Sequence, residues 1–322
     1  MSIKSLGNPR STYNAVWGQT AKGAVTPKPG PFEASGGTKT TSGDQTIHTF
    51  DYPNSDTFVV TGSPKTCEIL VIAGGGSGGS AGNAGWQGGG GGAGGYAYAT
   101  GHEMGAGTYT ITVGAGAAGV DNPDGSQDGP RGGWGADSIF TAPTTANTIH
   151  AEGGGGGGAG YTPGESTQMW GANGGSSGGA GSTPTSQPTI GPTNPNSWPA
   201  LQPTQNPAYS NGTLTQAGYP GGYESGGTGD GVGGGGGGAG GAGTPSPQSP
   251  TPTTGGGAGV SNSISGASVT YCEGGYSWGG PGPVPSINHT TKGSGGLGAP
   301  SASVTSGAGQ PGIVIISYPT PT

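Results

Sequence analysis

Two short glycine motifs in the sequence have the form of cofactor-binding or catalytic motifs. Residues 114–119 read GAGAAG, a GxGxxG pattern, and Asp137 lies downstream, where a dinucleotide site places its acidic residue. Such a site also needs a helix that holds the pyrophosphate, and residues 120–130 (VDNPDGSQDGP) cannot form one. GxSxG occurs around Ser77 and Ser176, but a nucleophile elbow needs a helix and a matched His and acid. We therefore expect no catalytic residues and no bound cofactor.

Acidic residues in one glycine-rich turn could offer oxygen ligands to a calcium ion. They are Asp121, Asp124 and Asp128 in DNPDGSQDG. The nearby GGWGAD at 132–137 matches one calcium-binding nonapeptide, but that repeat works by stacking tandem copies and it occurs once here. A solvated acidic turn explains the same residues, so we expect no metal site.

Large aromatic residues accompany the polar, proline-rich segments between the glycine runs. They are Trp170, Trp198, Tyr209, Tyr219, Tyr223, Tyr276 and Trp278. Side chains of this size are rarely left in solvent unless they pack locally or bind a partner. The sequence leaves both interpretations open for any single ring: a receptor-binding loop, or a loop pinned to the glycine-rich body.

Composition and charge narrow the classes of partner. Gly and Pro together make 82 + 29 = 111 of 322 residues, and no Gly-free and Pro-free window has helical periodicity. Residues 1–39 hold five bases and one acid (5 − 1 = +4), and residues 40–322 hold three bases and fourteen acids (3 − 14 = −11). An acidic body does not bind nucleic acid by counterion release. The sequence contains no apolar run of eighteen residues, so it predicts no membrane-spanning helix. Cys67 and Cys272 form either one disulfide or two reduced thiols.

Short segments rich in β-branched and aromatic residues predict strands. The predicted strands are Thr46–Tyr52, Thr57–Thr61, Cys67–Ala73, Tyr96–Thr100, Thr108–Val113, Ser138–Thr141, Thr148–Ala151, Ser268–Cys272 and Gly312–Tyr318. We expect Ser138–Thr141 and Thr148–Ala151 to form a hairpin. Cys67–Ala73 and Gly312–Tyr318 are both short and apolar, so we expect them to share one sheet.

Runs of glycine recur between the predicted strands. They include Gly88–Gly92, Gly153–Gly158, Gly233–Gly238 and Gly255–Gly257. A left-handed polyproline-II-type helix points its N–H and C=O groups outwards, so several such helices can hydrogen-bond side by side where only Gly fits between them. Flexible linkers are the alternative, but linkers rarely recur at similar length between strands. The sequence thus favours an all-β fold in which a small sheet or sandwich frame carries a bundle of polyglycine II helices, with essentially no α-helix.

The chain divides into an arm and a body. Residues 1–40 are predicted to be an extended docking arm without a fold of its own, anchored by Tyr13 and Trp17, and residues 41–322 to be the glycine-rich domain. Three inserts interrupt that domain, at 182–223, 244–254 and 280–292. If each insert is a turnaround at a helix end, all gather at the end of the bundle away from the arm. There they serve as recognition loops or as inert surface spacers.

The order of several blocks resembles the glycine-rich domain of bacteriophage tail fibre and appendage proteins. The blocks are ILVIAGGGSGG, GGGGGAGGYAYAT, AGTYTITVGAGAAG, GGWGADSIF, HAEGGGGGGAG and GQPGIVIISYP, within residues 66–319. The domain is similar to the T-even-type tail fibre adhesin, in which stacked polyglycine helices carry receptor-binding loops. The resemblance implies a virion protein that docks on another virion protein through its arm. It also implies binding to a bacterial surface glycan or outer-membrane protein. A head or capsid decoration fibre is the alternative, and a non-viral ice-binding or cell-wall protein is a weaker one.

Overall fold

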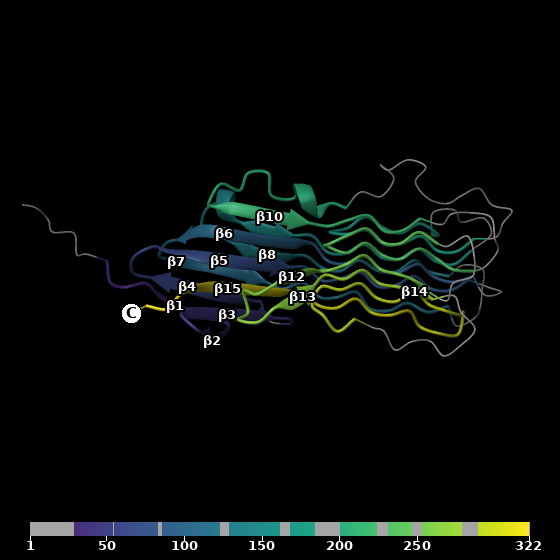
Figure 1. Ribbon diagram of the computed structural model, residues 1–322, viewed down its shortest axis with the longest axis horizontal. Coiled ribbons are helices and arrows are strands. Elements are labelled where there is room, and N and C mark those ends of the chain that lie inside the picture. Colours follow the sequence, from purple (N-terminus) through teal and green to yellow (C-terminus); the bar gives the residue numbers. More distant parts are fainter. Residues whose placement is uncertain are drawn as a thin grey trace, which may run out of the picture.

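The molecule is elongated, with a β-sandwich at one end and a bundle of extended glycine-rich segments at the other (Figure 1). The computed structural model describes residues 29–53, 55–82, 86–122, 129–161, 168–183, 200–223, 231–246, 253–278 and 289–321. In this part of the chain the regular elements are strands and two single-turn 3₁₀ helices, η2 (Thr145–Asn147) and η3 (Gln202–Thr204). The predicted all-β fold without α-helix is therefore confirmed.

Two antiparallel sheets form the sandwich. The six-stranded sheet has the order β10 (Thr213–Ala217), β6 (Tyr96–Met104), β5 (Lys65–Ile72), β15 (Ile313–Pro319), β3 (Gln45–Asp51), β2 (Thr38–Ser42). The five-stranded sheet has the order β1 (Glu33–Ser35), β4 (Asp56–Thr61), β7 (Gly107–Thr112), β8 (Ser138–Thr141), β9 (Ile149–Ala151). Two short ribbons pair β11 (Thr253–Thr254) with β14 (Ser277–Trp278), and β12 (Val260–Asn262) with β13 (Val269–Tyr271).

The last strand of the chain closes the larger sheet. β15 lies between β3 and β5, and its Ile316 pairs with Ile69 of β5 and His48 of β3. This pairing confirms that the two apolar segments share a sheet, and the pairing of β8 with β9 confirms the predicted hairpin.

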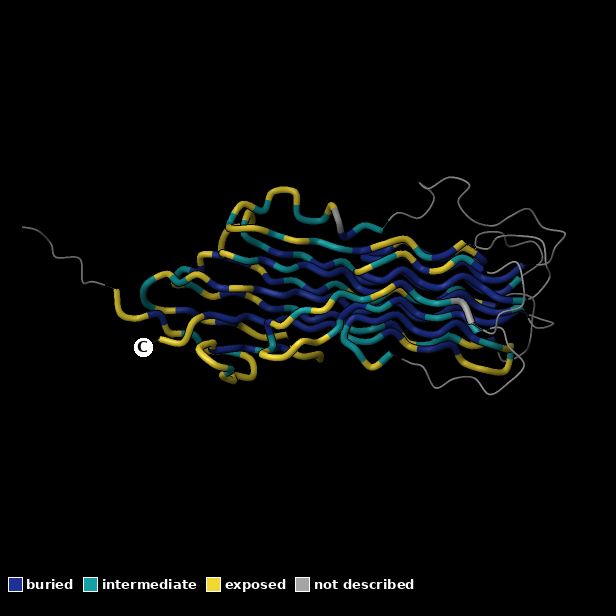
Figure 2. Tube along the Cα trace, viewed as in Figure 1, coloured by how far each residue is buried: buried dark blue, intermediate teal, exposed yellow. Residues whose placement is uncertain are grey.

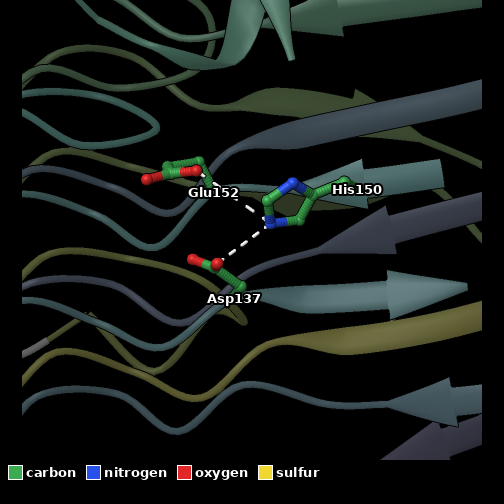
Figure 3. A group of neighbouring side chains, drawn as sticks. All are labelled: Asp137, His150 and Glu152. Carbon is green, nitrogen blue, oxygen red and sulfur yellow. Dashed lines mark hydrogen bonds and ion pairs between the residues drawn. The ribbon is translucent and has the colours of Figure 1, made fainter. Parts of the chain in front are cut away.

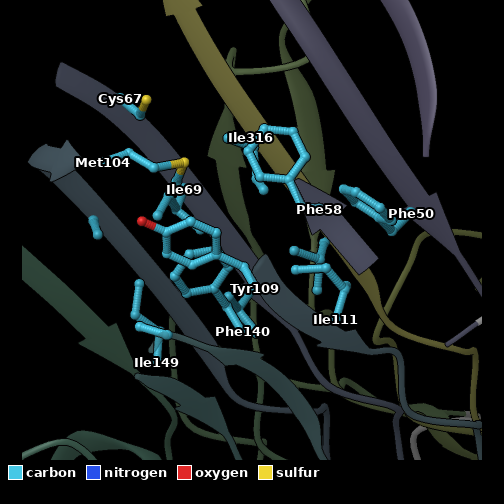
Figure 4. Packing of buried hydrophobic residues seen from close by; sticks show 14 of the residues in the cluster. Phe50, Phe58, Cys67, Ile69, Met104, Tyr109, Ile111, Phe140, Ile149 and Ile316 are labelled. Carbon is cyan, nitrogen blue, oxygen red and sulfur yellow. The ribbon is translucent and has the colours of Figure 1, made fainter. Parts of the chain in front are cut away.

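Alternate side chains of both sheets meet in one apolar core (Figure 4). Phe58 and Ile111 from the smaller sheet and Ile69 and Ile316 from the larger sheet are all fully buried. Burial of each such side chain stabilises the fold by about 1.5–3 kcal/mol. The opposite face of the larger sheet is covered by the β12–β13 ribbon, where a second cluster contains Cys272. Cys67 lies in the first cluster, so the two cysteines are separate free thiols.

The glycine-rich segments form a hydrogen-bonded bundle with a period of three residues. Along 88–95, the N–H groups of Gly88, Gly91 and Gly94 donate at 2.8–3.1 Å to segment 293–299. The intervening N–H groups donate to 152–158 and 234–237. The carbonyl groups of the segment accept from 73–79, 176–179 and 275–277. One segment thus contacts six neighbours, as in packed polyglycine II helices, and most of the bundle is buried (Figure 2). The bundle interpretation is confirmed over the linker interpretation for these segments.

Sandwich and bundle are continuous, because strands run directly into polyglycine segments. β5 leads into 73–82, β9 leads into 152–161, and 307–312 leads into β15 (Figure 1). Contacts in the bundle leave no room for side chains: a Cβ added to Gly155 or Gly236 would overlap the carbonyl oxygen of Ala172 or Gly91. The bundle therefore requires glycine at its contact positions.

The predicted arm is wrong for residues 33–40. β1 pairs with β4, and β2 pairs with β3, so these residues belong to the two sheets. Phe32 is buried, and its ring lies edge-on to that of Tyr318 at 4.8 Å. The strand β2 could not be predicted from its sequence, TKTTS, because it shows no alternation of apolar and polar residues. Four of its five residues are exposed, since β2 is an edge strand. The residues 1–28, which include Tyr13 and Trp17, lie outside the described part of the chain.

Two of the three predicted inserts are more than turnarounds at the bundle end. Within 182–223, β10 adds a strand to β6 at the edge of the larger sheet. At the end of 280–292, Lys292 forms an ion pair of 2.8 Å with Asp51 of β3. Residues 213–217 of the first insert and Lys292 at the end of the second therefore contact the sandwich.

Candidate functional site

Several large aromatic side chains project from the surface of the bundle. Trp134 is 55% exposed, Tyr219 44%, Tyr223 39% and Trp170 37%. The last three were predicted from the sequence as receptor-binding candidates, and the structure places them on the bundle surface. Exposed aromatic rings on a rigid support have a low ordering cost on binding, which suits them to contact a partner.

Trp134 was missed because it lies inside a glycine stretch and not beside a proline-rich insert. The three-residue period gives the signal that could have found it: residues 131, 134 and 137 recur one turn apart on one face of their segment. The Nε1–H of Trp134 donates to the carbonyl oxygen of Asn173 at 2.9 Å, and the guanidinium carbon of Arg131 lies 4.8 Å from the ring centroid. These contacts hold the ring in one orientation at the surface.

A groove of about 550 Å³ runs beside this tryptophan. Its lining comprises Val120, Gly129, Pro130, Arg131, Gly132, Gly133, Trp134 and Gln168. Apolar ring surface, a guanidinium group and a side-chain amide meet there, which are the groups that contact the apolar faces and hydroxyl groups of sugars. The groove and the exposed rings on other segments of the bundle are the candidate recognition features, and the term recognition surface below refers to all of them.

Other predicted rings are held by contacts within the protein. Tyr209 packs on the sandwich, not at the bundle end: its hydroxyl lies 2.8 Å from His102 Nδ1 and donates to the carbonyl oxygen of Asn211. Burial raises the pKa of Tyr209 to about 12. These contacts fit the alternative that this ring holds its own loop against the body of the protein. Tyr276 stacks on His289 with centroids 5.0 Å apart, and Trp278 is half-buried in β14.

Three of the receptor-loop and calcium candidates lie outside the described residues, and one ring pair was not predicted. Trp198 lies outside the described part of the chain, as do the calcium candidates Asp124 and Asp128; Asp121 is exposed. Trp86 and Tyr161 form an edge-to-face pair with centroids 6.2 Å apart. Both residues stand at ends of polyglycine segments, where no insert motif marks them.

A cluster of three ionisable side chains lies where β8 and β9 pass into the bundle (Figure 3). The Nε2 of His150 is 2.9 Å from Oδ2 of Asp137 and 4.0 Å from Oε2 of Glu152. The hydrogen bond from His150 lowers the pKa of Asp137, and the same bond raises the pKa of His150. Burial and the negative charge of Asp137 raise the pKa of Glu152. These side chains offer one imidazole nitrogen and two carboxylate oxygens to a cation.

Two side-chain amides hold the strand that carries this cluster. β9 is an edge strand, and Gln202 lies along it: its Oε1 accepts from the N–H of Glu152 at 2.7 Å and its Nε2 donates to the carbonyl of His150 at 3.0 Å. Asn206 Oδ1 accepts from the N–H of His150 at 2.8 Å. The amides replace the missing neighbour strand and fix the backbone of the cluster.

The comparison with protein families agrees with the architecture. A family model described as a glycine-rich domain matches residues 51–319. The chain belongs to the glycine-rich domain family. The matched range spans β4 to β15 and so includes the bundle and most of the sandwich strands; β1, β2 and nearly all of β3 precede it. A search of curated proteins found no match to the chain. Among its described residues, no helix has the length and apolar character needed to cross a membrane.

Proposed function

We propose that this glycine-rich domain protein is a bacteriophage virion component, a tail fibre or fibre tip that contributes to recognition of the host surface. The proposal rests on the difference between the two ends of the molecule. The described chain begins at residue 29 and ends at residue 321 on the sandwich side, opposite the free end of the bundle (Figure 1). A body of this shape can be attached at one end and present the other end to a partner.

The attachment is assigned to the N-terminal residues, which precede the first sandwich strand. Residues 1–28 hold four bases and no acid (+4), and residues 29–322 hold four bases and fifteen acids (4 − 15 = −11), so the N-terminal residues suit an acidic surface on another virion protein. Deletion of residues 2–28 leaves every described element in place. Particles assembled with this variant are expected to lack the chain, and full occupancy measured by mass spectrometry would contradict the docking role.

The recognition surface is assigned to the bundle, where the groove and the exposed rings lie. Its partner is a bacterial surface glycan or an outer-membrane protein, bound through ring stacking and amide hydrogen bonds. The rigid bundle keeps the rings in place, so little entropy is lost when they bind.

Removing exposed rings tests this role. The double variant Trp134→Ala and Tyr223→Ala should lower adsorption of particles to the host by about tenfold or more, since each lost aromatic contact costs about 1–2 kcal/mol. Tyr52→Ala is the matched control, because Tyr52 is 46% exposed but follows β3 of the sandwich. Normal incorporation with unchanged adsorption would make the chain a plain structural component and refute the recognition role.

A further inference from the structure

Three metal-ligating atoms converge on one point beside the sandwich. Asp137 directly precedes β8, His150 lies in β9 and Glu152 directly follows β9. One oxygen or nitrogen from each side chain lies within 4.8 Å of the other two. We propose that Asp137, His150 and Glu152 form a binding site for one divalent transition-metal ion of the zinc class. The three residues are not among those that line the groove, although Asp137 follows Trp134 by three residues on the same segment.

Two of the three ligand-atom distances are close to those of a tetrahedral site, and all three are at most 4.8 Å. Bonds of about 2.0–2.2 Å to a zinc ion place its ligand atoms about 3.3–3.5 Å apart. The observed 2.9 Å between His150 and Asp137 must widen by about half an ångström, and the 4.0 Å between His150 and Glu152 must shorten by as much. The side chains are 27–43% exposed, so small rotations at their solvent-facing ends suffice.

The backbone that carries the ligands is already fixed. Oδ1 of Asp137 accepts from the N–H of Gly153 at 2.8 Å, which turns Oδ2 towards His150. The amides of Asn206 and Gln202 hold the N–H groups of His150 and Glu152. Preorganised ligands lose little conformational entropy on binding, which raises the affinity for an ion.

The ligand types select the ion. An imidazole nitrogen favours Zn²⁺ or Co²⁺ over Ca²⁺ and Mg²⁺, which prefer oxygen ligands, and two carboxylates balance the charge of a dication. The simpler explanation is an ion pair between His150 and Asp137. That explanation gives Glu152 no part, although Glu152 also faces the imidazole (Figure 3).

Titration of the full chain with Zn²⁺ by calorimetry, and with Co²⁺ by visible absorption, tests the site. We expect one ion per chain with a dissociation constant at or below about 10 μM, and Co²⁺ absorption bands typical of four-coordination. His150→Ala should weaken binding by about 100-fold and Glu152→Gln by about tenfold. His289→Ala is the matched control, because His289 lies 3.2 Å from a single carboxylate, that of Glu273.

Three outcomes would overturn the proposal. They are no stoichiometric binding at 1:1, an affinity of His150→Ala equal to that of the parent, and loss of binding in His289→Ala alone. Circular dichroism of each variant without metal reports folding. If His150→Ala does not fold, the conservative Glu152→Gln decides: an affinity equal to that of the parent would leave only the ion pair.

Discussion

The backbone N–H of Gly91 donates to the carbonyl oxygen of Gly296 at 2.8 Å, and the carbonyl of Gly91 accepts from Gly275 at the same distance. Both partners come from late in the chain. The bundle therefore forms from segments that are far apart in sequence. The hydrogen bonds of the backbone N–H and C=O groups in its central segment are complete only after the late segments have packed against it. Contacts of this kind make folding slow and cooperative, because loop closure must precede the gain in hydrogen bonds.

Adjacent glycines of one segment should differ sharply in their tolerance of a methyl group. A Cβ on Gly132 would overlap the carbonyl oxygen of Ser77, whereas a Cβ on Gly133 meets its nearest atom at 3.5 Å. We expect Gly132→Ala to lower the free energy of unfolding by about 1–3 kcal/mol, and Gly133→Ala to change it little or raise it slightly. Thermal melting of the two variants checks this, and equal melting temperatures would contradict the packed bundle.

Gln202 should stabilise the edge of the smaller sheet. Its side chain is fully buried, and its amide bonds the carbonyl of His150 in β9 and the N–H of Glu152, which follows β9. Gln202→Ala leaves the N–H of Glu152 without this partner, whereas the carbonyl of His150 keeps the bond from Asn206 Nδ2 at 2.7 Å. We therefore expect a loss of about 1–3 kcal/mol and a greater tendency to aggregate through the open edge. Gln205→Ala is the control, since the Gln205 side chain donates to the carbonyl of Leu201 at 3.4 Å and, among the described residues, bonds no backbone group of β9. Chemical denaturation and light scattering compare the two; identical behaviour would refute the edge role.

Acid should destabilise the sandwich through His102. Burial lowers the pKa of His102 to about 4, below the 6.5 of an unfolded chain. Between pH 6.5 and 4 the unfolded state binds a proton that the native state does not, so the free energy of unfolding falls as the pH falls through this range, by up to about 3 kcal/mol. His102→Gln should flatten part of this slope, and denaturation at pH 4.5 and 7 gives the measurement. An unchanged slope would show that another group causes the acid sensitivity.

Removal of the last strand should abolish folding. β15 pairs with both β3 and β5, and its Val314 and Ile316 are fully buried. Deletion of residues 312–322 splits the larger sheet and exposes its core, so we expect no soluble folded protein. Deletion of residues 321–322 leaves β15 intact and is the control. A monodisperse, cooperatively melting 1–311 chain would contradict the role of β15.

The periodic parts of this fold could be predicted from the sequence, and the edges could not. Cys67–Ala73 and Gly312–Tyr318 have the apolar, β-branched composition of central strands, and runs such as Gly153–Gly158 indicate close backbone packing. The edge strands β2 and β10 carry polar, half-exposed residues, so their identity depends on the neighbouring strand and not on their own composition.

The candidate sites depended still more on tertiary structure. Trp170, Tyr219 and Tyr223 are exposed and Tyr209 packs on His102, although all four lie in or beside inserts and the sequence left both outcomes open for each ring. Asp137 and His150 meet only because the hairpin β8–β9 aligns their strand ends, and no metal-binding motif marks that spacing.

Imaging of phage particles with a label on this chain tests the central claim most directly. A gold-labelled antibody against the sandwich should mark a tail appendage, and a label on a loop at the bundle end should lie farther from the particle than the sandwich label. Label confined to the head, a reversed order of the two labels, or absence of the chain from purified particles would contradict the account.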